Sequence, residues 1–350
     1  MRAITVLPGT ANSARLDTVD APKQAHGLLS VRMLALGICG TDREIVSGAY
    51  GAAPAGHERL VLGHESLGVV EFAPEDCSFR TGDHAVGIVR RPDPVPCPAC
   101  ASGEWDMCRN GRYTEHGIKE RDGFAAERFN IAPDAAIKID KALGLAGVLL
   151  EPTSVVAKAW DHIDRVARRS AAWRAHTVLV TGAGPVGMLA ALLAKQRGLD
   201  VHVLDRAPSG PKPALVKALG GVYYAGDLDG LLDRLAPDIV IECTGATPVI
   251  HTLLGRLAPG GILCLLGVSN DKSLELDLGR LNRDTVLGNQ LVFGSVNANR
   301  LHYQMAVHAL ERADKTWLNG LISRRVPLAR FAEALENRAD DIKVVIDFSL

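Results

Sequence analysis

Apolar and polar positions follow different patterns in the first and later parts of this 350-residue chain. Over residues 1–150, short apolar runs are separated by turns rich in glycine and proline; three such runs are LLSVRMLALGI, ESLGVVEFA and DHAVGIV. Short apolar segments bounded by these turn residues favour β-strands. The pattern therefore predicts an irregular, all-β first domain.

The pattern changes at Glu151. The segment PTSVVAKAWDHIDRVARRS has helical spacing, and HTVLVTGAGPVGMLAALLAKQRGLDVHVLDR has the pattern of strand, tight turn, helix and strand. Further buried strands are predicted in IVIECTGA, ILCLLGV and QLVFGSV, with a helix in ATPVIHTLLGRLA. This alternation predicts an α/β domain built on a doubly wound parallel sheet. After Asn297 the sequence ends with another β-like run, KVVIDFSL.

A glycine motif lies in the first strand–helix turn of this second pattern. Gly182, Gly184 and Gly187, with Pro185 and Val186 between them, fit the dinucleotide motif G-x-G-x-x-G. The first glycine of such a motif permits a tight turn, the second lets a pyrophosphate approach, and the third packs helix against strand. We therefore predict that these residues bind a dinucleotide. The alternative is a glycine-rich turn that binds no ligand.

Asp205 bears on which dinucleotide is used. It ends the next predicted strand, 23 residues after Gly182. A carboxylate at this place can bond both hydroxyls of the adenine ribose, which favours NAD, and would repel the 2′-phosphate of NADP. The neighbouring Arg206 could offset that repulsion by pairing with the phosphate, or it could be a solvated surface charge. Both NAD and NADP therefore remain open as cofactors.

Four residues of the zinc-binding types stand in short distinctive segments. Cys39 lies in GICGTD, His64 and Glu65 lie in GHESLG, and Glu151 lies in LEP at the domain boundary. Thiolate, imidazole and carboxylate are the usual ligands of zinc. Taken singly, each has a simpler interpretation: Cys39 as a core residue, His64 as a buried hydrogen-bonded histidine, Glu65 as a surface acid. The sequence alone leaves both interpretations open for each of them.

Together, these motifs resemble those of a known family. GICGTD, GHESLGVV, a cysteine-rich lobe, LLEP and GAGPVG occur in the order seen in zinc-dependent medium-chain alcohol dehydrogenases, and the resemblance covers essentially the whole chain. VRRPDPVPCPACASGEWDMCRNGRYTEHGIKERDGFAAE, LLEPTSVVAKA and FGSVNANRLHY are similar to the glucose 1-dehydrogenase branch. The resemblance implies a GroES-like catalytic domain over residues 1–151 and 297–350. It implies a dinucleotide-binding Rossmann domain over residues 152–296.

The resemblance also assigns roles at a catalytic zinc. It implies that Cys39 and His64 are ligands, that Glu65 is a close and exchangeable partner, and that Glu151 is the third permanent ligand. Thr41 is the implied first proton acceptor, and either Glu44 or Glu65 could carry the proton onward. Thr41 could instead be a turn hydroxyl bonded to its own backbone, and Glu151 could be an acid that favours the helix dipole.

Substrate and cofactor contacts follow from the same resemblance. The implied sugar contacts are Thr41, Glu115, Glu151 and Asn297. A sugar requires paired hydrogen-bond donors and acceptors, whereas the pocket for a simple alkanol would be apolar. Without the resemblance, Glu115 would be taken as a surface acid and Asn297 as a turn amide. Further expected cofactor contacts are Thr244, Gly267, Asn297 and Lys343.

Three cysteines form a compact cluster in the first domain. Cys97, Cys100 and Cys108 resemble a structural-zinc lobe, which usually has four cysteines. The first of the four is missing, and Asp93 is the nearest candidate to replace it, because three thiolates and a carboxylate can hold zinc tetrahedrally. The alternative is a lobe without metal, in which these cysteines remain free thiols.

The bulk composition bears on the partners and the cellular compartment of the protein. The formal net charge is −1, which gives no reason to expect a nucleic-acid or membrane partner. An odd count of seven cysteines argues against a disulfide framework, so we expect a cytoplasmic protein. A homodimer or homotetramer is expected by analogy alone.

Two classes of function are consistent with these residues. The first is a zinc- and NAD(P)-dependent enzyme that oxidises an aldose, glucose in first place, at C1 to the lactone. Within that class, another polyol, a cyclitol or an amino sugar is the alternative substrate. The second class is a non-catalytic nucleotide-binding protein on the same fold. Loss of zinc ligands would favour it, but all four candidate positions carry competent side chains.

Overall fold

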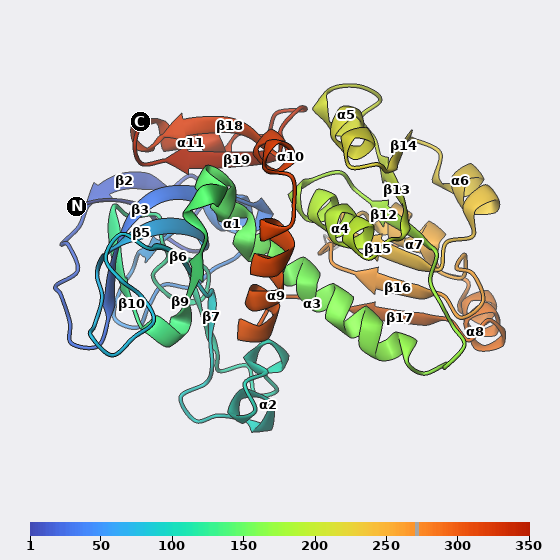
Figure 1. Ribbon diagram of the computed structural model, residues 1–350, viewed down its shortest axis with the longest axis horizontal. Coiled ribbons are helices and arrows are strands. Elements are labelled where there is room, and N and C mark those ends of the chain that lie inside the picture. Colours follow the sequence, from blue (N-terminus) through green and yellow to red (C-terminus); the bar gives the residue numbers. More distant parts are fainter. Residues whose placement is uncertain (270–272) are drawn as a thin grey trace. The chain divides into compact units, whose positions relative to one another are not determined.

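The computed structural model describes residues 1–269 and 273–350 and is drawn in Figure 1. The chain divides into two compact units by its internal contacts. Unit 1 comprises Met1–Ser154 and Asn297–Leu350, and unit 2 comprises Val155–Val296. Unit 1 is therefore discontinuous in sequence, and unit 2 is a single segment inserted into it.

Unit 2 is built on a six-stranded sheet in which every pairing is parallel. The strand order is β14-β13-β12-β15-β16-β17, so the order reverses between β12 and β15. The strands are β12 (Thr177–Thr181), β13 (Asp200–Asp205), β14 (Val222–Ala225), β15 (Ile239–Glu242), β16 (Ile262–Leu265) and β17 (Leu291–Gly294). The predicted doubly wound parallel sheet is confirmed.

Helices connect these strands, as the periodicity predicts for a parallel sheet. Figure 1 shows them on both faces of the unit 2 sheet. They are α3 (Leu150–Ala167), which begins in unit 1, and α4 (Pro185–Gln196), α5 (Pro211–Ala218), α6 (Leu228–Leu235), α7 (Thr247–Leu253) and α8 (Leu278–Leu287). The central helix α4 is buried from Gly187 to Ala194, which explains its apolar sequence.

Unit 1 is mainly β, with irregular sheets joined by turns. Its largest sheet has the order β11-β6-β5-β3-β19-β18, with β10 also paired to β3, and two three-stranded sheets have the orders β2-β1-β4 and β7-β8-β9. The strands are β1 (Arg2–Val6), β2 (Arg15–Thr18), β3 (Leu29–Ile38), β4 (Leu60–Val61), β5 (Glu65–Phe72), β6 (His84–Gly87), β7 (Arg90–Arg91), β8 (Thr114–His116), β9 (Glu120–Arg121), β10 (Arg128–Ile131), β11 (Ala136–Ile139), β18 (Ile322–Pro327) and β19 (Lys343–Asp347).

Short helices complete unit 1. The α-helices are α1 (Gly40–Val46), α2 (Pro98–Ala101), α9 (Arg300–Glu311), α10 (Lys315–Gly320) and α11 (Phe331–Leu335). The 3-10 helices are η1 (Trp105–Met107), η2 (Pro133–Ala135), η3 (Lys141–Leu149) and η4 (Leu328–Arg330). In Figure 1 the lobe around α2 extends away from the sheets of this unit. The sequence pattern did not predict α9, which begins after Asn299.

The C-terminal strand β19 completes the largest sheet of unit 1. It pairs antiparallel with β3, with Val344 opposite Ile38, and parallel with β18. All five of its residues are buried. Strand β19 is therefore part of the core of unit 1, the same unit that contains β1.

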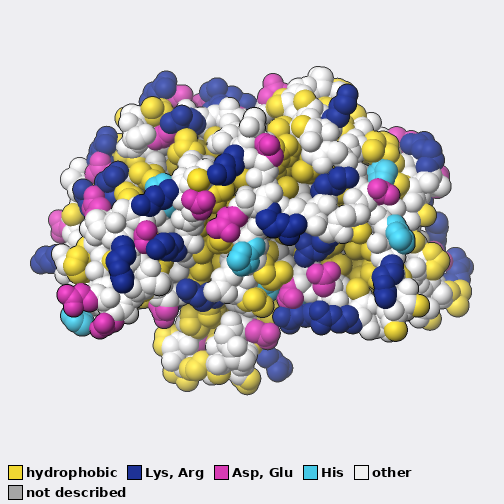
Figure 2. Space-filling model, viewed as in Figure 1, with side chains coloured by type: hydrophobic (Ala, Val, Ile, Leu, Met, Phe, Trp, Pro, Cys, Tyr) yellow, Lys and Arg dark blue, Asp and Glu magenta, His cyan; other side chains and the backbone are white. Residues whose placement is uncertain are grey.

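One helical stretch, Lys141–Ala167, is long and apolar enough to cross a membrane by length and composition, but 72% of its most apolar window is buried within the structure. Burial of this kind is found in the core helices of folded domains. On the face shown in Figure 2, acidic and basic side chains are interspersed, in keeping with the small net charge.

Candidate active site

Two strand ends bring the predicted zinc ligands of unit 1 together. Cys39 follows the last residue of β3, and His64 precedes Glu65, the first residue of β5. Because β3 and β5 are antiparallel neighbours with Gly37 opposite Glu65, the end of one strand lies beside the start of the other. The three ligand atoms of Cys39, His64 and Glu65 lie within 4.8 Å of one another.

Asp42 holds two members of this cluster. Its carboxylate accepts a hydrogen bond from the backbone N–H of Cys39 at 2.9 Å and lies 3.3 Å from Nδ1 of His64. The other ring nitrogen, Nε2 of His64, lies 3.0 Å from the Cys39 sulfur. Burial alone lowers the pKa of His64, but the negative charges of Cys39 and Asp42 outweigh it and raise that pKa well above its usual value. This imidazole therefore faces anionic partners on both sides.

Glu65 is paired with a lysine from the other end of the chain. Lys343, the first residue of β19, donates from Nζ to both carboxylate oxygens of Glu65, at 2.7 and 2.6 Å, and to the Ile38 carbonyl at 3.2 Å. Both side chains are buried, at 0% and 2% exposure. A Cβ on Gly37 would lie 2.0 Å from a Glu65 carboxylate oxygen, so a side chain at this position would displace that carboxylate.

This contact gives Lys343, predicted from the sequence as a cofactor contact, partners within unit 1. Its ammonium group is fully buried in unit 1 and its bonds go to Glu65 and to a backbone carbonyl. Lys343 therefore belongs to the cluster of candidate metal ligands, where it balances one carboxylate.

Glu151 lies in the first turn of α3 and is 9% exposed. Burial is the main cause that raises its pKa to about 7, and the charge of Glu65 adds to the rise, whereas His64 and Lys343 oppose it. Among the described residues, the group of ligand atoms within 4.8 Å holds Cys39, His64 and Glu65, and Glu151 stands outside it. Its carboxylate nevertheless shares the electrostatic environment of that group.

The donor set fits a zinc ion. It combines a thiolate, an imidazole and carboxylates, and the imidazole is oriented by a second carboxylate, as is typical of zinc-bound histidines. A buried carboxylate such as Glu151 is costly to ionise unless a cation lies nearby. Cys39, His64, Glu65 and Glu151 are therefore the residues of unit 1 that could hold zinc.

The predicted sugar contacts Glu115 and Asn297 are brought together within unit 1. Asn297 donates from Nδ2 to Oε1 of Glu115 at 2.8 Å, and Arg90 donates to the same oxygen from Nε and Nη2 at 3.0 Å. Glu115 and Arg90 are buried at 5% and 6% exposure. The Tyr113 ring lies 3.6 Å from the Arg90 guanidinium, a cation–π distance. Thr41 lies near the start of α1, two residues after Cys39, and is partly exposed.

The three cysteines of the lobe also converge. The sulfur atoms of Cys97, Cys100 and Cys108 lie within 4.8 Å of one another. Backbone N–H groups, with that of Arg109 foremost, lower the pKa of the Cys97 thiol to about 6. The Asp93 carboxylate is buried and accepts hydrogen bonds from the backbone of Val95 and the side chain of Asn110. Asp93 therefore lies beside the cluster, with its carboxylate bonded to the protein.

The glycine motif of unit 2 forms the turn between β12 and α4. Gly182 has φ +93°, a conformation that favours glycine, and a Cβ on Gly187 would lie 1.8 Å from the Gly182 carbonyl oxygen. Gly184 caps the N-terminus of α4, and a Cβ there would meet nothing within 4 Å. Open space therefore lies beside the start of this helix, where backbone N–H groups can meet a pyrophosphate.

Asp205 ends β13 beside this turn. Its carboxylate accepts hydrogen bonds from the backbone N–H groups of Ala183 at 2.6 Å and Ala207 at 3.1 Å. It also pairs with Lys212, whose Nζ lies 3.2 Å away. Arg206 is exposed. Lys212 therefore pairs with the carboxylate that the sequence predicts to contact the ribose, and Arg206 is the next residue in the chain.

The remaining predicted cofactor contacts lie on the loops after β15 and β16. Thr244 donates from its backbone N–H to the buried Glu242 carboxylate at 2.7 Å. A Cβ on Gly182 would lie 2.9 Å from a methyl carbon of Thr244, and a Cβ on Gly267 would lie 2.0 Å from the backbone nitrogen of Gly245. These loops therefore meet at the carboxyl ends of the strands, next to the point where the strand order reverses.

The sequence pattern did not identify several functional residues. Asp42, Arg90 and Lys212 hold His64, Glu115 and Asp205 respectively. The GICGTD segment itself contains Asp42, so its closeness to Cys39 was a usable signal. No pattern in the sequence pairs Arg90 with Glu115 or Lys212 with Asp205.

Comparison with known proteins covers the whole chain. Residues 25–141 match the family described as alcohol dehydrogenase GroES-like domain, and residues 144–348 match glucose dehydrogenase C-terminus. The glucose 1-dehydrogenases of Thermoproteus tenax and Methanocella arvoryzae are 40% and 36% identical to this chain, over 99% of both chains in each case. The solved structure of Haloferax mediterranei glucose dehydrogenase in complex with NADP, Zn and gluconolactone matches at 30% identity, with a TM-score of 0.92 and 100% coverage of both chains.

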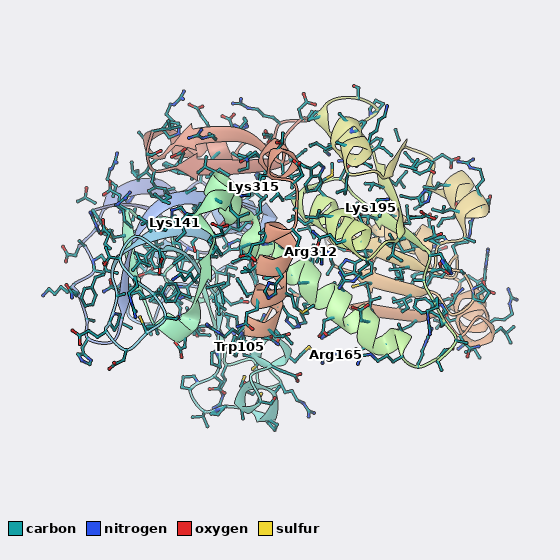
Figure 3. All side chains as sticks on the ribbon, in the orientation of Figure 1. Trp105, Lys141, Arg165, Lys195, Arg312 and Lys315 are labelled. Carbon is teal, nitrogen blue, oxygen red and sulfur yellow. The ribbon has the colours of Figure 1, made fainter. Side chains whose placement is uncertain are left out.

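Replacing Lys343 tests whether the buried ion pair stabilises unit 1. We expect Lys343→Met to lower the free energy of unfolding by about 3 kcal/mol, because it leaves the Glu65 carboxylate buried without its counter-charge. The measurement is urea unfolding of metal-free protein, so that metal binding does not contribute. Lys141→Met is the matched control, since Lys141 is an exposed lysine of the same unit (Figure 3). Equal unfolding midpoints for both variants would contradict this role of the ion pair.

Proposed function

The chain belongs to the glucose 1-dehydrogenase branch of the zinc-dependent medium-chain alcohol dehydrogenases, and we propose that it transfers a hydride from C1 of an aldose, glucose in first place, to NAD(P)⁺. The product is the lactone. The observation that carries the proposal is the convergence of the Cys39, His64 and Glu65 ligand atoms within 4.8 Å. Unit 1 would then be the catalytic domain and unit 2 the dinucleotide-binding domain.

Each residue at the zinc cluster has a distinct proposed role. Cys39, His64 and Glu151 would hold a zinc ion, which would supply a Lewis acid for the substrate hydroxyl. Asp42 fixes the orientation of His64 through Nδ1. Glu65 is an exchangeable partner of the metal, and Lys343 holds its carboxylate. Thr41 is the proposed acceptor of the hydroxyl proton.

A sugar would be recognised through Glu115 and Asn297. Among the described residues, the side chains that donate to Glu115 all reach Oε1, namely those of Arg90 and Asn297. The second oxygen, Oε2, is then available to accept a bond from a sugar hydroxyl. A buried acceptor held in this way discriminates against substrates that lack the hydroxyl, because the acceptor would lose its partner. This arrangement favours a polyhydroxylated substrate over a simple alcohol.

Both nicotinamide cofactors fit the end of β13. Asp205 can bond the adenine ribose of NAD, while Lys212 and Arg206 can offset its charge against the 2′-phosphate of NADP. The relative from Haloferax mediterranei was solved with NADP. We therefore propose that the protein uses NAD⁺ and that NADP⁺ is not excluded.

We further propose a cytoplasmic homo-oligomer, either a dimer or a tetramer. All seven cysteines are free thiols, which suits a reducing compartment. Exposed apolar side chains gather on α8, where Leu278, Val286 and Leu287 are 68%, 62% and 76% exposed. Apolar side chains grouped in this way favour contact with a second chain.

A substrate panel tests the proposed activity. We expect glucose, galactose or xylose to reduce NAD⁺ or NADP⁺ with a higher kcat/KM than polyols, cyclitols or simple secondary alcohols, because Glu115 and Asn297 select for sugar hydroxyls. Absorbance of the reduced cofactor reports the rate. Preference for a cyclitol or amino sugar would replace the aldose but keep the dehydrogenase. No activity with zinc-loaded protein on the whole panel would favour a non-catalytic nucleotide-binding protein.

Glu151→Ala distinguishes a zinc ligand from a helix N-terminal acid. Loss of a ligand should cut turnover by about 100-fold, or ~3 kcal/mol, and weaken zinc affinity. Loss of a dipole contact costs under about 1 kcal/mol of stability and leaves turnover intact. Glu151→Cys is the informative partner, because it supplies a thiolate in place of the carboxylate. Near-normal turnover and zinc binding in Glu151→Ala would show that Cys39, His64 and Glu65 hold the metal alone.

The cysteine lobe is proposed to hold a second, structural zinc through Cys97, Cys100 and Cys108, with Asp93 as the possible fourth ligand. Elemental analysis of protein purified without chelator should approach two zinc per chain. Cys97→Ser should reduce the value to about one, because a thiolate is lost from a tetrahedral site. A value of one in both the parent protein and the variant would mean that the lobe holds no metal.

A further inference from the structure

A cavity of about 580 Å³ lies in unit 1 among the ends of several strands. Three of the residues that line it are arginines: Arg91 of β7, Arg121 of β9 and Arg300 of α9. Its lining, drawn from the described residues, contains none of the four candidate ligands of the catalytic zinc. The cavity therefore shares no lining residue with the candidate ligands of the catalytic zinc.

The three guanidinium groups are held by neutral acceptors. Arg91 donates to the backbone oxygen of Ala135 at 3.1 Å, and Arg300 donates to the backbone oxygen of Asp134 at 2.6 Å. Arg121 donates from Nε to a threonine hydroxyl at 3.0 Å. Over residues 1–269 and 273–350, no carboxylate oxygen lies within 4.0 Å of any of the three. Most of their N–H groups are therefore left for another acceptor, since each guanidinium has five.

The charges around the cavity do not cancel. Three arginines and one acid, Asp134, line it, which gives a net formal charge of +2. His116 also lines it and remains neutral, because burial first and then the charge of Arg91 lower its pKa to about 3. Burial and the charge of Arg121 lower the pKa of Arg91 to about 10, so Arg91 is still cationic near neutral pH. Like charges repel here unless an anion lies between them.

Trp105, the first residue of η1, lines the cavity and lies where the α2 lobe joins the rest of unit 1 (Figure 3). Its indole Nε1 is buried and, within the described part of the chain, has no hydrogen-bond partner. Because this nitrogen is buried, it is not accessible to a ligand in the cavity, and the case for an anion rests on the three arginines.

We propose that this cavity binds the dianionic phosphoryl group of a small organic metabolite. Two unbalanced positive charges match a phosphate dianion better than a single carboxylate. Planar guanidinium groups are suited to phosphate oxygens. The cavity is larger than a phosphate group needs, and Leu28, Pro92 and Ile131 in its lining can contact the organic part.

Calorimetric titration of the zinc-loaded protein with inorganic phosphate tests the site, at constant ionic strength. We expect saturable binding that is weakened about tenfold by Arg121→Gln and by Arg300→Gln, the loss of one charge-assisted hydrogen bond in each case. Arg312→Gln is the matched control, because Arg312 is an exposed arginine of unit 1 outside the cavity (Figure 3).

Two further probes show which kind of anion the cavity binds. A hexose 6-phosphate should bind more tightly than inorganic phosphate if the apolar lining contacts the organic part, and acetate should bind at least tenfold more weakly than phosphate. Equal phosphate affinity in the parent protein, Arg121→Gln and Arg300→Gln would overturn the proposal and place any bound phosphate elsewhere, such as the glycine turn of unit 2. Acetate binding as tight as phosphate binding would overturn it as well. Because no turnover is measured, the result is independent of the proposed dehydrogenase activity.

Discussion

Negative charge buried at one end of the largest sheet of unit 1 has to be balanced, and the rest of that unit is arranged around this requirement. Glu65 and Glu151 are both buried there, close to the Cys39 thiol and to Asp42. Among the described residues, Lys343 is the one lysine that contacts Glu65. Because Lys343 begins β19, the chain must return from unit 2 and insert its last strand next to β3. The discontinuity of unit 1 therefore follows from the chemistry of its site as much as from its core.

Close backbone packing determines how the site of unit 2 is arranged, as charge balance does in unit 1. The turn after β12 and the loops after β15 and β16 approach so closely that Gly182, Gly187 and Gly267 have no room for a Cβ. Gly184 has room, and its space lies at the start of α4, where free N–H groups can meet a phosphate. Steric contact thus explains three of these glycines, and access for a ligand explains the fourth.

The sequence was informative where structure is set locally. The parallel sheet of unit 2 could be predicted because each strand, turn and helix has its own periodicity and turn residues. KVVIDFSL was predicted as β-like, and β19 confirms this prediction. Its partner strand β3 lies some three hundred residues earlier, so no local sequence pattern could predict the pairing. For the same reason the sequence did not predict the Lys343–Glu65 pair, and Lys343 was predicted only as a cofactor contact. Helix α9 was missed because polar residues such as Arg300 and Gln304 interrupt its apolar positions. The convergence of Arg91, Arg121 and Arg300 depends on three separate elements, so it emerges only in the folded chain.

The position of β19 has a consequence for biosynthesis. Cys39, His64 and Glu65 leave the ribosome early, and the whole of unit 2 follows as one contiguous segment that can fold while it is being made. Lys343 belongs to β19, which is synthesised after the whole of unit 2. The nascent chain therefore holds the Glu65 carboxylate without its counter-charge while unit 2 is being made. Closing the site in unit 1 accordingly follows the synthesis of unit 2, and a chain that stops just before β19 would have a complete unit 2 attached to an unfinished active site.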